Sequence, residues 1–158
     1  VAGQTKRLIN EIVIHCSATP EGRDFSVAQI KTCHLARGFN DIGYHYVIYR
    51  DGSIHAGRSE ALVGAHAPGH NTNSIGICYI GGYAADGKTC KDTRTPAQKA
   101  ALVSLIKTLI AKYPTIKKII GHRDTSPDLN HNGLIEPFEY IKGCPCFDAI
   151  PEYQNLIK

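Results

Sequence analysis

Short apolar runs alternate with two capped helical segments along the 158 residues, and this alternation constrains the fold more than any other feature. Residues 10–15 and 117–122 are β-branched runs of strand length, and residues 43–57 form two extended runs around an Asp-Gly turn. The apolar stretch "IGICYIGG", residues 75–82, predicts a further buried strand. Strands and helices mixed along one chain predict a mixed α/β (α+β) fold, in which a central mixed β-sheet is flanked by α-helices.

Each helical segment begins with a capping box, in which a hydroxyl residue is followed three residues later by glutamine. The two boxes pair Ser26 with Gln29 and Thr95 with Gln98. They predict one helix over residues 27–37 and a second, longer helix that starts with proline at its first position. The second helix carries an apolar face for packing on the sheet, made by Leu102, Leu105, Ile106, Leu109 and Ile110.

Length and composition favour a single globular domain over residues 1–158, and we expect a monomer. Lysine and arginine exceed aspartate and glutamate by only 18 to 14, and they are not gathered into a basic stripe, so nucleic-acid binding is not predicted. The sequence has no apolar run near the roughly 20 residues of a membrane span. Its first ten residues also lack the apolar segment of a signal peptide.

The six cysteines fall into two groups. Four are expected to be ordinary structural residues: Cys16, Cys33, Cys78 and Cys90. Cys144 and Cys146 differ because a single proline separates them, which holds them too close for the usual disulfide geometry. A metal ligand or a single functional thiol is the better interpretation of this pair.

Two apolar strands each end in a histidine, His15 and His122. If the strands are parallel, both imidazoles lie at the sheet edge where ligands bind in open α/β sheets. A loop that returns to this edge would add Cys144, and two imidazoles with one thiolate suit zinc with an open fourth position. A purely structural role for these histidines stays open, because their spacings match no short zinc motif and single histidines are often structural.

Several motifs, in order along residues 10–148, resemble one family. They are "VIHCSATP", "DIGYHYVIYRDGSIHAGR", "VGAHAPGHNTNSIGICYIGG", "TPAQ", "GHRDTSP" and "KGCPCFD". Together they resemble the type 2 N-acetylmuramoyl-L-alanine amidases, in particular the phage lysozyme branch, which is related to the peptidoglycan recognition proteins. The resemblance implies an amidase-like fold and zinc-dependent cleavage of the amide between N-acetylmuramic acid and L-alanine. The partner is then bacterial peptidoglycan (muropeptide), and the site of action is the bacterial cell wall. The resemblance does not specify the compartment from which the protein reaches it.

The resemblance also implies roles for individual residues. His15, His122 and Cys144 match the zinc ligands, while Tyr44 and Lys142 match the catalytic tyrosine and lysine. A tyrosine hydroxyl can orient or deprotonate water, and a lysine ammonium can stabilise the negative charge of a tetrahedral intermediate. Segments that resemble the substrate groove contain the candidate substrate-binding residues His34, Arg37, His66, Asn71 and Asn73.

The connection between His122 and Lys142 is longer than in the compact phage enzymes and contains a calcium-loop pattern. The pattern D-x-[DN]-x-[DN]-G-x5-E is filled by Asp128, Asn130, Asn132, Gly133 and Glu139. Calcium bound here would brace the loop that carries Lys142 and Cys144. An Asn-Gly turn without an ion is the alternative, because no incoming helix precedes the loop and two asparagines replace acidic ligands.

Two other functions are compatible with parts of the sequence. A non-catalytic peptidoglycan-binding recognition module would lack a cysteine ligand, so Cys144 argues against it. A thiol redox site at "CPC" on an unrelated fold would be active without zinc. Cys146, for which the family has no ligand role, is either a passive neighbour or a substitute for Cys144.

Overall fold

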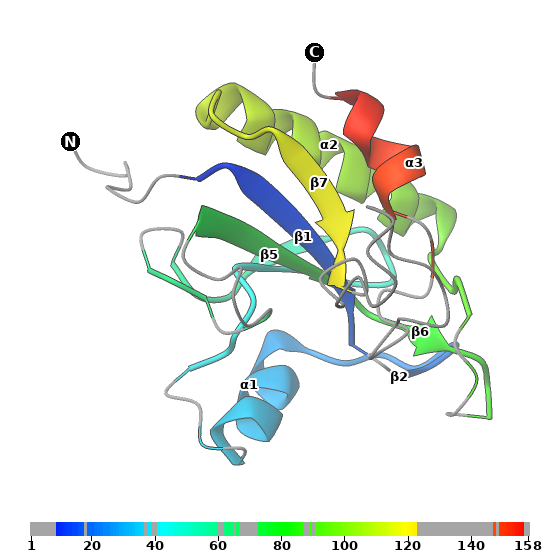
Figure 1. Cartoon of the computed structure of the whole chain (residues 1–158). Helices are drawn as coiled ribbons and strands as arrows, with labels where there is room; N and C mark the ends of the chain where they lie inside the picture. Colours follow the sequence, from blue (N-terminus) through cyan, green and yellow to red (C-terminus); the bar gives the residue numbers. More distant parts are fainter. Residues whose placement is uncertain are drawn as a thin grey trace, which may run out of the picture.

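The structure is a computed structural model that describes residues 9–17, 19–36, 38, 41–59, 62–64, 66, 73–86, 89, 91–122, 147 and 149–156. A five-stranded sheet forms its centre (Figure 1). In spatial order its strands are β4 (Ile54–Ala56), β3 (Tyr46–Ile48), β5 (Ser74–Tyr79), β1 (Glu11–Cys16) and β7 (Lys118–Gly121). β3, β5, β1 and β7 run parallel to one another, whereas β4 is antiparallel to β3. The predicted mixed sheet is therefore confirmed.

Within the residues that the structure describes, three helices and a 3-10 turn accompany the sheet. They are α1 (Val27–Ala36), α2 (Pro96–Lys112), α3 (Ala149–Tyr153) and η4 (Gln154–Leu156). Both predicted capping boxes are present: Gln29 N donates to Ser26 Oγ at 3.2 Å, and Gln98 N donates to Thr95 Oγ1 at 3.1 Å. No helix in the described ranges is long and apolar enough to cross a membrane.

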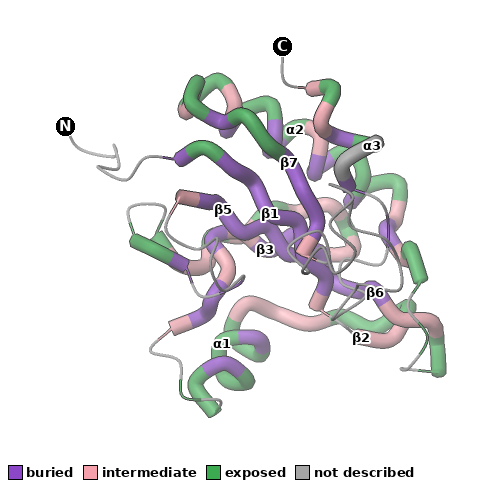
Figure 2. The backbone as a smooth tube through the Cα atoms, in the orientation of Figure 1, coloured by how far each residue is buried: buried purple, intermediate pink, exposed green. Residues whose placement is uncertain are grey.

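The two faces of the sheet bury different kinds of side chain, because residues alternate between faces along each strand. On β1, Ile12, Ile14 and Cys16 pack in one core cluster with the apolar face of α2. The opposite face of β1 carries His15, and on this side of the sheet Ile30 of α1 packs in a separate cluster. Figures 1 and 2 show α2 and α3 on one side of the buried strands and α1 on the other. His15, a residue of the candidate functional site described below, is therefore on the α1 side of the sheet.

The structure contains a second, two-stranded sheet that the sequence did not predict. From the sequence, only loops are expected after β1 and β5. β2 (Thr19–Pro20) pairs in parallel with β6 (Gly82–Tyr83). Strands of two residues are too short to give a periodic pattern, so nothing local in the sequence marks them. They continue the parallel course of β1 and β5 beyond the main sheet.

The cysteines of the described chain have different environments. Cys16 and Cys78 are buried, as predicted, whereas Cys33 is exposed on α1. Cys90, Cys144 and Cys146 lie outside the described residues.

Candidate functional site

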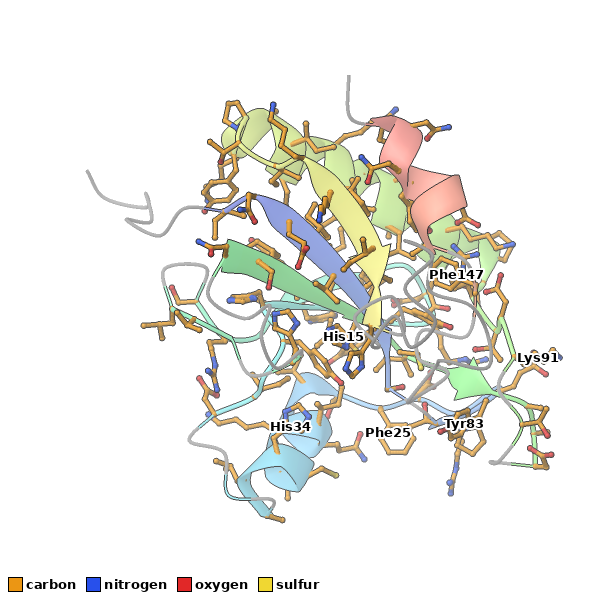
Figure 3. All side chains as sticks on the ribbon, viewed as in Figure 1. His15, Phe25, His34, Tyr83, Lys91 and Phe147 are labelled. Atoms are coloured by element: carbon orange, nitrogen blue, oxygen red, sulfur yellow. The ribbon has the colours of Figure 1, made fainter. Side chains whose placement is uncertain are left out.

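Parallel strands bring His15 and His122 together at one edge of the sheet. β1 and β7 are parallel, with Ile14 opposite Gly121, so the histidine that comes after each of these residues is at the same level. The two ring centroids are 4.5 Å apart. Figure 3 shows His15 at the ends of the strands, between the sheet and α1. The predicted juxtaposition of these imidazoles is confirmed, while their role as metal ligands stays a prediction.

Tyr44 lies beside His15, in the segment that leads into β3. Its ring centroid is 5.0 Å from that of His15 and 5.3 Å from that of His34. Burial raises the pKa of the neighbouring Cys78 thiol well above its ordinary value, and a hydrogen bond with Tyr44 acts in the opposite direction. Cys78 is therefore a neutral thiol at neutral pH. The arrangement places a phenol next to the predicted metal ligands, while the catalytic role of Tyr44 stays a prediction.

His66 makes a close polar contact with His15. The distance from His15 Nε2 to His66 Nδ1 is 2.9 Å, and the distance from His66 Nε2 to Ser74 Oγ is 3.1 Å. All three side chains are buried. The sequence predicts His66 as a substrate contact and gives no sign of its pairing with His15, which is 51 residues away in the chain. We use the name "histidine cluster" for His15, His66, His122, Tyr44 and Ser74.

His45 is a buried histidine that sequence reasoning did not single out. Gly76 N donates to its Nδ1 at 3.0 Å, and its Nε2 donates to the carbonyl of Leu62 at 2.9 Å. Because a carbonyl only accepts and an amide N–H only donates, these two bonds fix the neutral tautomer of His45 with the proton on Nε2. The residue joins the loop at 62–64 to β5, and its contacts are typical of a structural histidine.

The other predicted substrate-binding residues have different surroundings. His34 is buried on α1, and Gly43 N donates to its Nδ1 at 2.8 Å. Asn73 directly precedes Ser74 at the amino end of β5, whereas His15 lies opposite Cys78 near the other end of that strand; the Asn73 carbonyl accepts from Asn10 N at 2.9 Å. Arg37 and Asn71 lie outside the described residues.

The donor chemistry at the strand ends fits zinc, since imidazole nitrogen is a preferred zinc donor. Within the described ranges, no group of three His, Cys, Asp or Glu side chains is arranged to hold a metal ion. A zinc site here would therefore need a third ligand from outside the described residues. The predicted residues Lys142 and Cys144 lie outside the described residues, as do all those of the calcium pattern: Asp128, Asn130, Asn132, Gly133 and Glu139.

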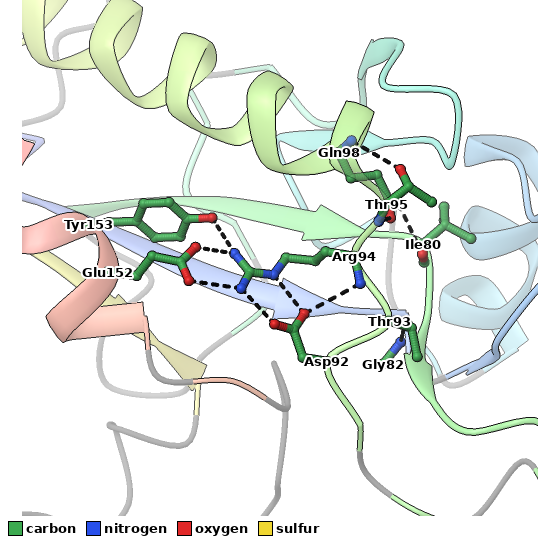
Figure 4. Close-up of polar contacts among 9 residues, drawn as sticks. All are labelled: Ile80, Gly82, Asp92, Thr93, Arg94, Thr95, Gln98, Glu152 and Tyr153. Carbon is green, nitrogen blue, oxygen red and sulfur yellow. Dashed lines mark hydrogen bonds and ion pairs between the residues drawn. The ribbon is translucent and has the colours of Figure 1, made fainter.

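A second polar cluster lies on the α2 side of the sheet, around the buried Arg94 (Figure 4). The Arg94 guanidinium donates to both carboxylate oxygens of Asp92 at 2.8 Å, to both of Glu152, and to the hydroxyl of Tyr153. Its carbon atom Cζ lies 3.5 Å from the centroid of the Phe147 ring. These five residues form what we call the Arg94 cage. The sequence gives no indication of it.

Charge pairing shifts the pKa values within the Arg94 cage. Hydrogen bonds from Arg94 lower the pKa of Glu152, while burial acts in the opposite direction. For Asp92, burial raises the pKa, but the bonds and charge of Arg94 outweigh it and the net shift is downward. Burial raises the pKa of Tyr153. At neutral pH the cage thus holds one cation, two carboxylates and a neutral phenol.

Comparison with known proteins gives consistent matches. A sequence model of the N-acetylmuramoyl-L-alanine amidase family matches residues 4–132. An endolysin of Enterobacteria phage T3 is 42% identical over 137 residues, which cover 87% of this chain and 80% of that protein. Peptidoglycan-recognition protein LB of Drosophila melanogaster is 36% identical over 149 residues, covering 89% of this chain and 58% of that protein.

The fold is also similar to solved structures. The N-acetylmuramoyl-L-alanine amidase LysC from Clostridium intestinale URNW superposes with a TM-score of 0.70 at 29% sequence identity. The match covers 93% of this chain and 83% of that one.

Proposed function

We propose that this chain, which belongs to the N-acetylmuramoyl-L-alanine amidase family, hydrolyses the amide bond between N-acetylmuramic acid and L-alanine in bacterial peptidoglycan. It would thereby act on the bacterial cell wall, as a single catalytic domain over residues 1–158 and as a monomer. The observation that carries the proposal is the contact of His15 and His122, with ring centroids 4.5 Å apart, beside the ring of Tyr44.

Zinc is the proposed cofactor, with His15, His122 and Cys144 as its ligands. Two neutral imidazoles and one thiolate suit this metal, and three protein ligands leave a position open, as in catalytic zinc sites. A bound zinc ion would supply a Lewis acid that polarises the amide carbonyl and makes water more acidic.

The side chains of the chain itself supply the remaining steps. Tyr44, 5.0 Å from His15 between ring centroids, would orient the attacking water and accept its proton. Water adds to the amide carbon, and the ammonium of Lys142 would stabilise the negative charge that develops on the carbonyl oxygen. The C–N bond then breaks, and the proton that Tyr44 took from the water passes to the leaving nitrogen, which gives the free amino group of alanine.

Among the predicted substrate contacts, Arg37 and Asn71 are retained as ligands for the carboxylates and amides of the peptide. His34 is retained as a residue that lines the proposed substrate groove, since its ring lies against Tyr44. His66 has both ring nitrogens within hydrogen-bonding distance of other side chains, and Asn73 lies at the far end of β5. Neither of these two is as well placed to contact substrate.

Calcium is the second proposed ion, on the basis of the pattern formed by Asp128, Asn130, Asn132, Gly133 and Glu139. If calcium braces the loop that carries Lys142 and Cys144, removing calcium while zinc is retained lowers both activity and melting temperature. Unchanged values of both after selective chelation would contradict the calcium proposal.

The test of the main proposal is product analysis with a purified muropeptide. We expect zinc-loaded protein to release peptide with a new amino group on alanine, and we expect zinc chelation to abolish this release. Tyr44→Phe should lower kcat by about 100-fold or more, because it removes the group that handles the proton of water. Zinc content of the variant should equal that of the parent protein.

A non-catalytic recognition module is the second candidate, and the similarity to a peptidoglycan-recognition protein favours it. It predicts that the muropeptide binds but that no new amine appears, with or without added zinc. That result would replace the amidase proposal.

A further inference from the structure

We infer that His66, backed by Ser74, is a positioning residue that holds the ring of His15 and accepts its Nε2–H when Nδ1 of His15 binds the metal. The inference rests on the proposed function, in which His15 is a metal ligand. It assigns to His66 a role different from the substrate contact expected from the sequence.

The geometry of the contact supports this role. His15 Nε2 lies 2.9 Å from His66 Nδ1, and the two rings are nearly perpendicular, at 89°. His15 is 1% exposed and His66 is 7% exposed. A polar contact that is shielded from water in this way constrains both rings, because breaking it would cost a buried hydrogen bond.

The backbone leaves room for the His66 ring at two glycines. A Cβ atom at Gly76 of β5 would lie only 2.7 Å from Cγ and Cδ2 of His66. A Cβ atom at Gly64 would lie 2.7 Å from the same Cδ2. The ring therefore lies directly against the backbone of β5, where no side chain at these two positions could be accommodated without a shift. This close fit limits the ring to one position.

The contacts from His15 through His66 to Ser74 allow two arrangements of protons, because the serine hydroxyl can accept or donate. One order has His15 Nε2–H donating to His66 Nδ1, and His66 Nε2–H donating to Ser74 Oγ. The reverse order, with Ser74 as the first donor, places the proton of neutral His15 on Nδ1. Because a metal binds the ring nitrogen that has no proton, a metal on Nδ1 of His15 requires the first order.

The predicted metal ligand His15 therefore has a hydrogen-bond acceptor, His66, for the ring nitrogen that does not bind the metal. Metal-binding histidines generally donate their second ring N–H to another protein group, and loss of that group typically costs about 10–100-fold in metal affinity. Here the acceptor is an imidazole, which is itself held by a serine. His66 thus favours metal binding by His15 without contacting either metal or substrate.

The decisive measurement is zinc affinity, determined by competition with a chelating dye. His66→Phe removes the acceptor and fills the space, and we expect zinc affinity to fall about 10–100-fold. His66→Asn places an amide oxygen near the position of Nδ1 and should recover most of the affinity. His55→Phe is the matched control, because His55 lies in the β3–β4 hairpin and stacks on Tyr49. Its zinc affinity should equal that of the parent.

A second readout does not depend on substitution. In zinc-loaded protein, long-range ¹H–¹⁵N spectra should show His15 with a proton on Nε2 and zinc on Nδ1. Zinc on Nε2 of His15 would overturn the inference, since that atom would then not contact His66.

The outcomes separate this inference from the proposed function. If the parent protein neither binds zinc nor cleaves muropeptide, the proposed function fails. If the parent does both, and His66→Phe keeps zinc affinity within about twofold while KM rises, His66 is a substrate contact and only the inference fails. Should His66→Phe not fold, as judged by circular dichroism of the zinc-free protein, Ser74→Ala and His66→Asn decide. Loss of affinity in Ser74→Ala that exceeds the loss in His66→Asn supports the inference, and parent-like affinity in Ser74→Ala contradicts it.

Discussion

The Arg94 cage and the histidine cluster are both polar and each has buried side chains at its centre, yet they are built in opposite ways. In the cage, the five N–H donors of Arg94 meet five acceptors, and one cation is matched by two carboxylates. In the histidine cluster the groups are imidazoles, a phenol and a hydroxyl, each of which can donate or accept. The cage has a single arrangement of protons at neutral pH, whereas the cluster has at least two.

This difference indicates that the Arg94 cage serves stability and the histidine cluster serves chemistry. A charged group whose donors are all used contributes by holding segments together, and it becomes costly when one partner is removed. A group that can exchange donor and acceptor roles can bind a metal or move a proton. We therefore expect substitutions in the two clusters to affect different measured quantities.

The largest expected effect is loss of a ligand from the histidine cluster. His122→Ala should lower zinc affinity by more than about 100-fold, beyond the cost of losing an outer contact, and should abolish muropeptide cleavage. The free energy of unfolding of the zinc-free variant should lie within about 0.5 kcal/mol of that of the parent, because His122 is only partly buried. A variant that binds zinc normally would show that His122 is not a ligand.

Replacement of Lys142 should separate turnover from metal binding. We expect Lys142→Ala to keep its zinc and lose about 100- to 1,000-fold in kcat, the usual cost of removing one donor to the oxyanion. Zinc content by metal analysis and steady-state kinetics measure the two quantities. An equal loss of zinc and activity would count against the assignment of Lys142.

Substitution in the Arg94 cage should change stability instead. Arg94→Met leaves Asp92 and Glu152 without their cation, and we expect a loss of about 2 kcal/mol in the free energy of unfolding. We use a value below that of a fully buried pair, because the two carboxylate side chains are 35% and 41% exposed. Arg50→Met is the matched control, because its partner Asp24 is 82% exposed, and it should cost about 0.5 kcal/mol or less. Equal losses in the two variants would show that the cage is no stronger than a surface ion pair.

The smallest expected effect is the pH dependence of the cage. Since the pKa values of Glu152 and Asp92 are lowered in the folded protein, their contribution to stability is complete above the unfolded carboxyl pKa of about 4. It is lost as pH falls through the lower folded values. The stability gap between parent and Arg94→Met should therefore be constant from pH 7 to about 5 and shrink below about pH 4. Urea unfolding of the zinc-free proteins measures the gap, and a gap that stays constant at low pH would contradict this account.

Local sequence signals predicted most of the secondary structure, and for a clear reason. Capping boxes, an Asp-Gly turn and apolar runs act over a few residues, so they can be read without the fold. His15 and His122 were also predicted to meet, because each one comes directly after a strand and parallel strands end at the same edge. The pairing of His15 with His66 and of Arg94 with Glu152 has no local signal. These contacts join residues 51 and 58 positions apart and exist only after the chain has folded.

The 3-10 turn η4 has a consequence for the placement of His122. Gln154 accepts from Ile119 N at 2.9 Å and donates to the carbonyl of Lys117 at 3.0 Å, so its amide acts as a clip on the outer edge of β7. Successive residues of a strand point to opposite faces, and a slip of β7 by a single residue would turn the His122 ring toward α2 and away from His15. One glutamine near the end of the described chain thus protects the alignment on which the meeting of the two imidazoles depends.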